Sequence, residues 1–216
     1  MVLKLHSYWR SSAAFRVRIA LGLKGLPFDT QPVHLTLGGG EQHGADYRAL
    51  NPQELVPTLV AGEAVLTQSL AIIEYLEESY PEPALLPRSP VARARVRALA
   101  LAIACEIHPL NNLRVLQYLG QSFGADEAAK ATWYRHWLET GLAPLERQLA
   151  ASAQTGRYCH GDQPGLADTC LVPQLYNARR YALDLAPYPT LLRIEAACLE
   201  LPAFLAALPE RQPDAP

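Results

Sequence analysis

Two hydroxyl side chains stand together near the N-terminus, where a helix is predicted to begin. Ser11 and Ser12 follow a mostly apolar run at residues 2–6, which predicts a short strand. Apolar residues then recur at intervals of three and four over residues 13–24, as in an amphipathic helix. A helix N-terminus presents unpaired N–H groups and a partial positive charge, so this position favours an anion. The basic residues of this helix are predicted to lie mostly away from its apolar face; they are Arg16, Arg18 and Lys24.

The simplest interpretation of Ser11 or Ser12 is an N-cap, which is the usual role of a serine just before a helix. The neighbouring residues Tyr8, Trp9 and Arg10 favour a second interpretation. Two bulky aromatic side chains and a cation beside a cap are more typical of a pocket rim than of a plain turn. The residues alone leave both interpretations open.

A second hydroxyl stands before a second predicted helix. Residues 56–60 and 64–66 predict two short strands around a tight turn, and Pro57 can be an edge-strand proline. Gln68 and Ser69 follow directly, ahead of an apolar-patterned helix. Ser69 alone predicts another cap. Two such helix starts with a proline between them, in the order βαβ and then ββα, indicate an anion site more specifically.

A proline-rich stretch at residues 81–90 predicts an extended linker between two domains. Before it, the strands and helices above and a further strand at residues 28–35 form an α/β domain over residues 1–80. After it, residues 91–216 show helical periodicity and no strand pattern, which predicts an all-helical domain. Its later helices are expected over about residues 126–149, 166–182 and 188–201.

Composition excludes several classes of partner. Nineteen Lys and Arg against twenty-one Asp and Glu leave a formal net charge of −2, without a basic block for nucleic acid or an acidic membrane. No apolar run approaches the roughly 20 residues that span a membrane, and no signal peptide is evident, so a cytoplasmic location is expected. The cysteines form no CxxC pair and are expected to be reduced and mostly buried; they are Cys105, Cys159, Cys170 and Cys198.

The segment CEIHPLNNLRVLQYL carries several polar side chains beside Pro109. We expect them along one long helix that the proline kinks toward a cleft, although an ordinary solvated helical face explains them as well. Cys105 and His108 stand three residues apart, but no second pair completes a metal site, so no metal is expected.

The run SYWRSSAAFRVRIAL resembles the N-terminal signature of the zeta-class glutathione transferases, whose members include maleylacetoacetate and maleylpyruvate isomerases. The resemblance extends almost from end to end of the chain. It implies a thioredoxin-like βαβ-ββα domain followed by a C-terminal helical bundle, glutathione as a coenzyme, and a homodimer. One position departs from the signature: Ala13 stands where many members carry cysteine, so no cysteine is expected in the active site.

The resemblance also implies roles for individual residues. Ser11 corresponds to the serine that hydrogen-bonds the glutathione sulfur, with Ser12 and Arg10 beside it. Val56 is expected to offer its main chain to glutathione next to a cis Pro57, and Gln68 with Ser69 to hold the γ-glutamyl carboxylate. In the second domain, the implied glutathione and substrate residues are His108, Asn112, Arg114 and Arg180, and Asp168 is expected in a buried capping role with Gly165 at the N-cap.

The implied reaction is glutathione-dependent isomerisation of maleylacetoacetate to fumarylacetoacetate, a step of aromatic amino-acid catabolism. The thiolate adds reversibly to the cis double bond of this small dicarboxylate. Arginines suit such a substrate because their planar fork matches a carboxylate, which favours Arg10, Arg114 and Arg180. The open alternatives are maleylpyruvate isomerisation, a broader transferase or dehalogenating activity, and, more distantly, a binding module without catalysis.

Overall fold

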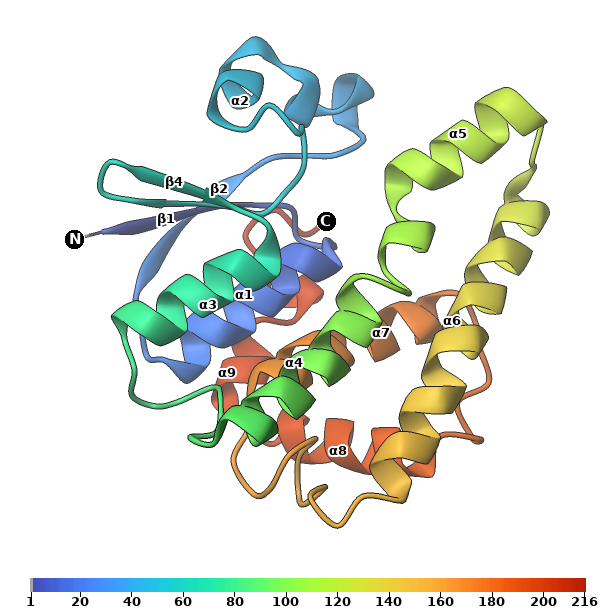
Figure 1. Ribbon diagram of the computed structural model, residues 1–216. Helices are drawn as coiled ribbons and strands as arrows, with labels where there is room; N and C mark the ends of the chain where they lie inside the picture. The colour runs from blue at the N-terminus through green and yellow to red at the C-terminus, as the bar shows by residue number, and fades with distance from the viewer. Residues whose placement is uncertain (1) are drawn as a thin grey trace. The chain divides into compact units, whose positions relative to one another are not determined.

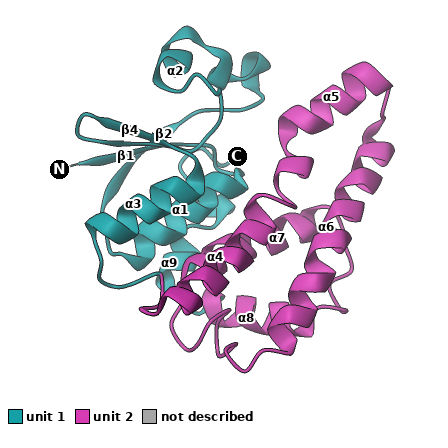
Figure 2. Cartoon of the chain, viewed as in Figure 1, with its two compact units in different colours: residues 1–85, 199–216 teal, residues 86–198 magenta. Residues whose placement is uncertain are grey.

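The computed structural model describes residues 2–216. The chain forms two compact units, which are residues 1–85 with 199–216 and residues 86–198 (Figure 2). The predicted division into residues 1–80, 81–90 and 91–216 differs from these units mainly at the C-terminal end, where the chain returns to the first unit. The returning chain packs closely there: a Cβ added at Gly22 would lie 3.1 Å from Cβ of Ala203.

The first unit contains a four-stranded sheet in the order β2-β1-β3-β4. Strand β1 (Leu3–Ser7) pairs in parallel with β2 (Phe28–Pro32) and antiparallel with β3 (Thr58–Ala61), which pairs antiparallel with β4 (Ala64–Thr67). Helices α1 (Ser12–Leu23) and α3 (Ser69–Ser79) cover one face of the sheet, and α2 (Ala45–Leu50) lies on the other side (Figure 1). This arrangement confirms the predicted thioredoxin-like βαβ-ββα order.

The loop between β2 and α2 contains two short 3₁₀ turns, Leu37–Gly39 and Glu41–His43. Strand β2 is shorter than predicted: it ends at Pro32 rather than near residue 35. Near the C-terminus, the short helix α9 (Pro202–Ala206) packs beside α1. A last 3₁₀ turn, Pro209–Arg211, follows it.

Helix α1 is buried on nearly all sides, and the basic residues predicted to lie mostly away from its apolar face are buried as well. Arg16 and Arg18 are each 2% exposed, and Lys24 just after the helix is 6% exposed. Each cation has polar partners inside the unit. Lys24, for example, donates from Nζ to Glu77 Oε2 over 2.6 Å and to Tyr80 O over 2.7 Å. Buried charges persist only when they are paired and hydrogen-bonded in this way.

The second unit is built from helices, as predicted. Its elements are α4 (Pro90–Ala104), α5 (Leu113–Phe123), α6 (Glu127–Ala150), α7 (Leu166–Arg180) and α8 (Pro189–Leu199), joined by loops and one 3₁₀ turn (Pro109–Asn111). The expected long helix around Pro109 is not formed: α4 ends at Ala104, and α5 begins only at Leu113. A proline lacks the N–H that would continue the α-helical ladder.

Several helix ends in the second unit follow local sequence rules. Ser89 caps α4 by accepting from Ala92 N–H over 3.2 Å, with Pro90 as the first helical residue. Gly165 is the N-cap of α7, and Asp168 Oδ2 accepts from its N–H over 2.8 Å. These ends confirm the predicted capping roles.

All four cysteines are free, and Cys159, Cys170 and Cys198 are buried. Among residues 2–216, no group of three or more His, Cys, Asp and Glu side chains is arranged to hold a metal ion. Within the same residues, no helix has the length and apolar character needed to cross a membrane.

Candidate functional site

The strand register brings the predicted residues of the first unit to one end of the sheet. His6 of β1 pairs with Thr58 of β3, and Thr58 pairs with Thr67 of β4. At this end of the sheet, the chain therefore leaves β1 toward Ser11, enters β3 from Val56 and leaves β4 toward Gln68. Segments that are more than fifty residues apart in sequence become neighbours there.

Ser11 is the N-cap of α1, so the capping interpretation is confirmed. Its Oγ accepts from Ala14 N–H over 3.2 Å, and its own N–H closes a turn onto Tyr8 O over 2.9 Å. The cap uses only a lone pair of the hydroxyl, so the Ser11 O–H remains a donor for a further group. A cap and a ligand contact are therefore compatible at this residue. Ser12 is the first residue of the helix and is buried.

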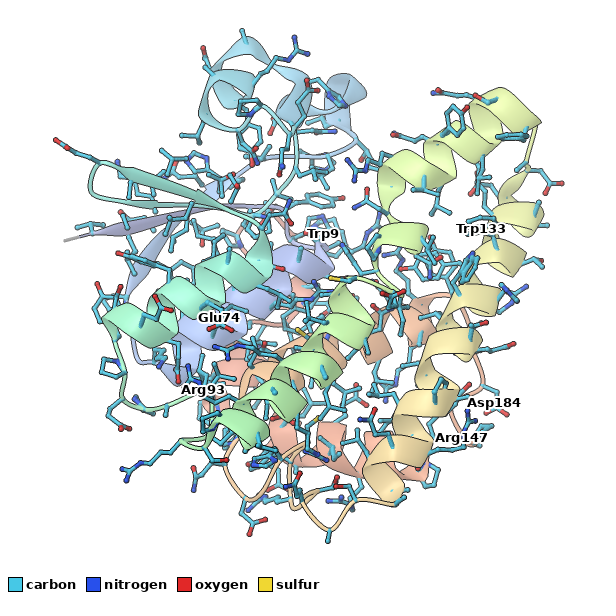
Figure 3. The ribbon with its side chains drawn as sticks, in the orientation of Figure 1. Trp9, Glu74, Arg93, Trp133, Arg147 and Asp184 are labelled. Atoms are coloured by element: carbon cyan, nitrogen blue, oxygen red, sulfur yellow. The ribbon has the colours of Figure 1, made fainter. Side chains whose placement is uncertain are left out.

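The residues before Ser11 form the rim of this helix start. Trp9 lies beside the beginning of α1 (Figure 3), and the Arg10 guanidinium stacks over its ring, with Cζ 5.3 Å from the ring centroid. Tyr8 is buried in an apolar cluster with Val33, Tyr47 and Val56, against which Trp9 also packs. The aromatic side chains thus connect the turn before Ser11 to Val56.

Val56 precedes a cis peptide bond to Pro57, as the resemblance implies. Strand β3 pairs with its neighbours only from Thr58 onward, so Val56 lies outside the strand ladder. Its side chain is buried while its backbone sits at the same end of the sheet as Ser11.

Ser69 differs from the predicted serine cap. The N-cap of α3 is Gln68, with φ of 67°, and Ser69 is the first helical residue. Ser69 Oγ accepts instead from Nη1 of Arg16 over 3.3 Å. The buried Arg16 guanidinium therefore adds a positive charge behind a helix N-terminus that already favours anions. The sequence did not indicate this role of Arg16, because the 3.6-residue pattern of the helix placed Arg16 on a polar side of α1.

Gln68 is exposed and donates from Nε2 to Gln53 Oε1 over 2.8 Å. This bond connects the loop before β3 with the start of α3. An exposed amide at a helix start retains groups that can bond a ligand carboxylate and amine.

In the second unit, the HPLNN segment forms a tight turn rather than one helical face. Asn112 caps α5 and accepts at Oδ1 from Arg114 N–H over 3.1 Å. Its neighbour Asn111 is buried and donates to Tyr134 O over 3.2 Å. His108 is half-buried at the start of the 3₁₀ turn, and the Arg114 side chain is exposed.

Arg180 is the last residue of α7. Its guanidinium lies over the Tyr181 ring, 4.9 Å from the centroid, and donates to Asn177 Oδ1 over 3.3 Å. Tyr181 stacks on Tyr134 at a centroid distance of 3.5 Å. Because Asn111 bonds the Tyr134 carbonyl, these aromatic residues join the end of α7 to the HPLNN turn. Sequence reasoning missed Tyr134 and Tyr181, since nothing in their spacing marks them.

One further hollow lies within the first unit but holds none of the predicted residues. It encloses about 490 Å³ beneath α2 and is lined by residues that include His6, Val33, Tyr47 and Leu50. Burial lowers the pKa of the His6 imidazole, with a smaller effect of Lys4 in the same direction. The residues predicted at the helix starts thus do not line this hollow.

Residues 10–79 match the family model described as glutathione S-transferase, N-terminal domain. That range includes the helix starts at Ser11 and Ser69. The fold of the first unit and the matched segment thus define the N-terminal domain of a glutathione S-transferase.

Full-length relatives refine the class. A Vibrio cholerae protein called a probable maleylacetoacetate isomerase is 54% identical over 215 residues, which cover 100% of this chain and 99% of that protein. A solved structure of a bacterial zeta-class maleylpyruvate isomerase superimposes with a TM-score of 0.96 at 51% identity, covering 99% of this chain and 100% of the other. The chain belongs to the zeta-class glutathione transferase family that contains these isomerases.

A further similar structure shows which ligands a relative binds. The maleylacetoacetate isomerase of Methylobacterium extorquens AM1 was solved with malonate and glutathione. It is 44% identical, has a TM-score of 0.95 and covers 99% of each chain. That relative accommodates a small dicarboxylate together with glutathione.

Proposed function

We propose that this chain is a glutathione-dependent cis-trans isomerase that converts maleylacetoacetate to fumarylacetoacetate. The observation that carries the proposal is the Ser11 hydroxyl at the N-terminus of α1. Its acceptor lone pair is occupied by Ala14 N–H at 3.2 Å, which leaves the O–H to donate to a sulfur anion. The chemistry that bound glutathione supplies is reversible thiolate addition to the cis double bond, which permits rotation about that bond.

The physical requirement is a lowered thiol pKa. A free thiol has a pKa near ~8.5, so only a few per cent is thiolate at neutral pH. Lowering this value by about two units requires ~2.7 kcal/mol of preferential stabilisation of the anion. A hydrogen bond to a charged acceptor contributes ~1.5–3 kcal/mol and a helix end ~0.3–1 kcal/mol. Ser11 and the α1 terminus, flanked by Ser12 and Arg10, can therefore stabilise the thiolate by about the required free energy without a separate base.

The second helix start suits the γ-glutamyl end of glutathione. Ser69 and Gln68 stand at the N-terminus of α3, and the Arg16 guanidinium donates to Ser69 Oγ over 3.3 Å. A carboxylate there gains from the helix terminus and from this buried cation. In the same proposal, Val56 bonds glutathione through its main chain. His108 and Asn112 of the second unit are the further glutathione residues that the resemblance implies.

The substrate carboxylates are assigned to Arg10, Arg114 and Arg180. Arginine presents paired donors that match a carboxylate, and positive charge also stabilises negative charge that develops during addition. The malonate and glutathione bound in the Methylobacterium extorquens relative support a dicarboxylate substrate.

The deciding experiment compares wild type, Ser11→Ala and Ser89→Ala with maleylacetoacetate and maleylpyruvate, followed optically with and without glutathione. Ser89 is the matched control, because its Oγ caps α4 with a bond of the same 3.2 Å length. We expect glutathione-dependent turnover that falls about 100-fold in Ser11→Ala and stays near wild type in Ser89→Ala. An absence of turnover despite glutathione binding would reject the isomerase and leave a transferase or binding module.

Maleylpyruvate is the second candidate substrate, favoured by the TM-score of 0.96 with a maleylpyruvate isomerase. The larger kcat/KM in the same assay identifies the substrate. We also propose a cytoplasmic homodimer; light scattering that gives the mass of one 23.7 kDa chain would reject the dimer.

A further inference from the structure

The turn that ends in Ser11 is bonded on both sides to side chains outside it. Trp9 N–H donates to Asp214 Oδ2 over 2.8 Å, and Trp9 O accepts from Arg18 Nη2 over 3.0 Å. Both main-chain polar groups of Trp9 are therefore occupied. Asp214 is 205 residues later in the sequence, so the turn depends on a segment that local propensity does not include.

Arg18 connects this turn to the end of β1 and to the segment after α9. Its guanidinium donates to Ser7 Oγ over 3.1 Å, and its Nε and Nη2 donate to Ala207 O over 3.1 and 3.0 Å. Burial lowers the pKa of Arg18 to about 9, while the nearby Asp214 carboxylate acts in the opposite direction. The side chain therefore remains a cation at neutral pH, and its fork has a rigid geometry that lysine does not share.

Asp214 is bound less completely than Arg18. Its Oδ1 is buried and has no hydrogen-bond partner among residues 2–216, whereas Oδ2 takes the Trp9 N–H. A buried carboxylate oxygen without a donor reduces stability. The hydrogen bond that Asp214 makes is therefore the one to the turn, and its charge lies near Arg18, which bonds the same turn.

We propose that Asp214 and Arg18 are positioning residues for the isomerase, which hold the Tyr8–Ser11 turn so that the Ser11 hydroxyl donates to the glutathione sulfur. Neither residue is assigned a contact with a ligand. The inference rests on the proposed function, since it concerns how the same site is held.

The physical reason is preorganisation. A short turn without these bonds samples several backbone conformations, and small displacements of a catalytic group reduce rates steeply. Because the cap from Ser11 to Ala14 holds only one side of the turn, the Trp9 bonds supply the restraint on the other. Their loss is expected to weaken thiol ionisation more than glutathione binding.

The test uses the full chain with Asp214→Ala, Asp214→Asn and Asp126→Ala. Asn retains an acceptor for Trp9 N–H but no charge. Asp126 is the matched control, because its Oδ1 accepts from Ala129 N–H over 2.8 Å in an exposed cap of the second unit. The readouts are hydrogen exchange of the Trp9 amide without glutathione, ultraviolet titration of the bound glutathione thiol, and kcat and KM.

We expect Asp214→Ala to lose protection of the Trp9 amide and to raise the pKa of the bound thiol by about 0.5–1 unit. At pH 7 its kcat should fall about fivefold to tenfold, with a smaller change in the KM for glutathione. Asp214→Asn should stay within about twofold of wild type, as should Asp126→Ala.

Equal losses in Asp214→Ala and Asp214→Asn would overturn the proposal, because charge rather than position would then be the cause. An unchanged thiol pKa in Asp214→Ala, with the Trp9 amide deprotected, would overturn it as well. If wild type ionises no bound thiol, the proposed function fails instead, and the exchange of Trp9 without glutathione still shows whether Asp214 holds the turn.

Discussion

Helices α1 and α5 both carry predicted site residues at their N-terminal ends, but they are built in opposite ways. In α1 almost every residue is buried, including Arg16 and Arg18, and the polar groups bond to distant parts of the first unit. In α5 no residue is buried, and Tyr118 and Phe123 form an exposed aromatic pair. The Asn112 cap that starts α5 bonds only to the residue two positions away.

This difference suggests a division of labour within the proposed enzyme. The thiol-activating turn requires one backbone geometry, so a network of buried bonds around α1 restrains it. Residues that bind a substrate carboxylate tolerate more freedom, because exposed arginines reach a ligand with long side chains. Substitutions should therefore act globally around α1 and locally around α5.

The largest effect is expected for Lys24→Met at the C-terminal end of α1. Lys24 pairs with the buried Glu77 at 2.6 Å, and its removal breaks this buried ion pair. We expect the free energy of unfolding, measured in urea, to fall by about 3–5 kcal/mol. Lys130→Met is the control, because Lys130 pairs at 2.8 Å with the exposed Glu127 and should cost less than about 0.5 kcal/mol. Similar losses in both variants would contradict the comparison.

The second unit has a buried charge of its own, Asp168, which gives a prediction for pH. Burial raises the pKa of Asp168 above its usual 3.8, although bonds from the N–H groups of Cys159 and Gly165 oppose this. The native state then holds the proton to higher pH than the unfolded chain, so stability is lost as pH rises through the native pKa. Each unit of the shift corresponds to about 1.4 kcal/mol.

The measurement is urea unfolding of wild type and Asp168→Asn from pH 3.5 upward. The difference between the two proteins in the free energy of unfolding should change as pH rises through the native pKa of Asp168. It should level off above that pKa. A difference that is independent of pH would show that Asp168 has no raised pKa.

A smaller and local effect is expected at the exposed arginines. Arg114→Ala and Arg180→Ala should each raise the KM for the dicarboxylate about tenfold, which is ~1.4 kcal/mol, because each removes a paired donor. The dissociation constant of glutathione should change little. Arg193→Ala, on the exposed side of α8, is the control for loss of a positive charge. An increase in KM of the same size in Arg193→Ala would indicate general electrostatic attraction instead.

The smallest effect is expected for Asn112→Ala, which removes the cap of α5. A lost cap costs about 1 kcal/mol, and here it should appear as faster amide exchange at the first turn of α5. Global unfolding should change less than in Lys24→Met. A global loss as large as that of Lys24→Met would mean that α5 is held by more than its local bonds.

The elements that the sequence predicted well are those with local causes. The caps at Ser11, Ser89 and Gly165 lie within three residues of the groups that they bond, so residue types at short spacing were sufficient. The order of elements along the first domain, βαβ and then ββα, also followed from the alternation of strand and helix patterns. The caps therefore appeared in the sequence with the correct residues.

The features that the sequence did not predict depend on partners far along the chain. The periodicity of α1 placed Arg16 and Arg18 away from its apolar face and did not show that they are buried, where each side chain bonds a group at least 53 residues distant. The cap expected at Ser69 is replaced by a bond to Arg16 for the same reason. The pattern of apolar and polar residues describes one helix at a time. It contains no information on which other elements of the fold pack against that helix.

By itself, the sequence determined the two-part architecture, the helix starts that favour anions and, through resemblance, the class of reaction. The tertiary structure decided which charges are buried, that residues 199–216 return to the first unit, and that Asp214 bonds the turn before Ser11. The reason is physical: capping and periodicity are short-range properties of a chain. A buried charge is instead stabilised by whichever polar groups the fold brings to it.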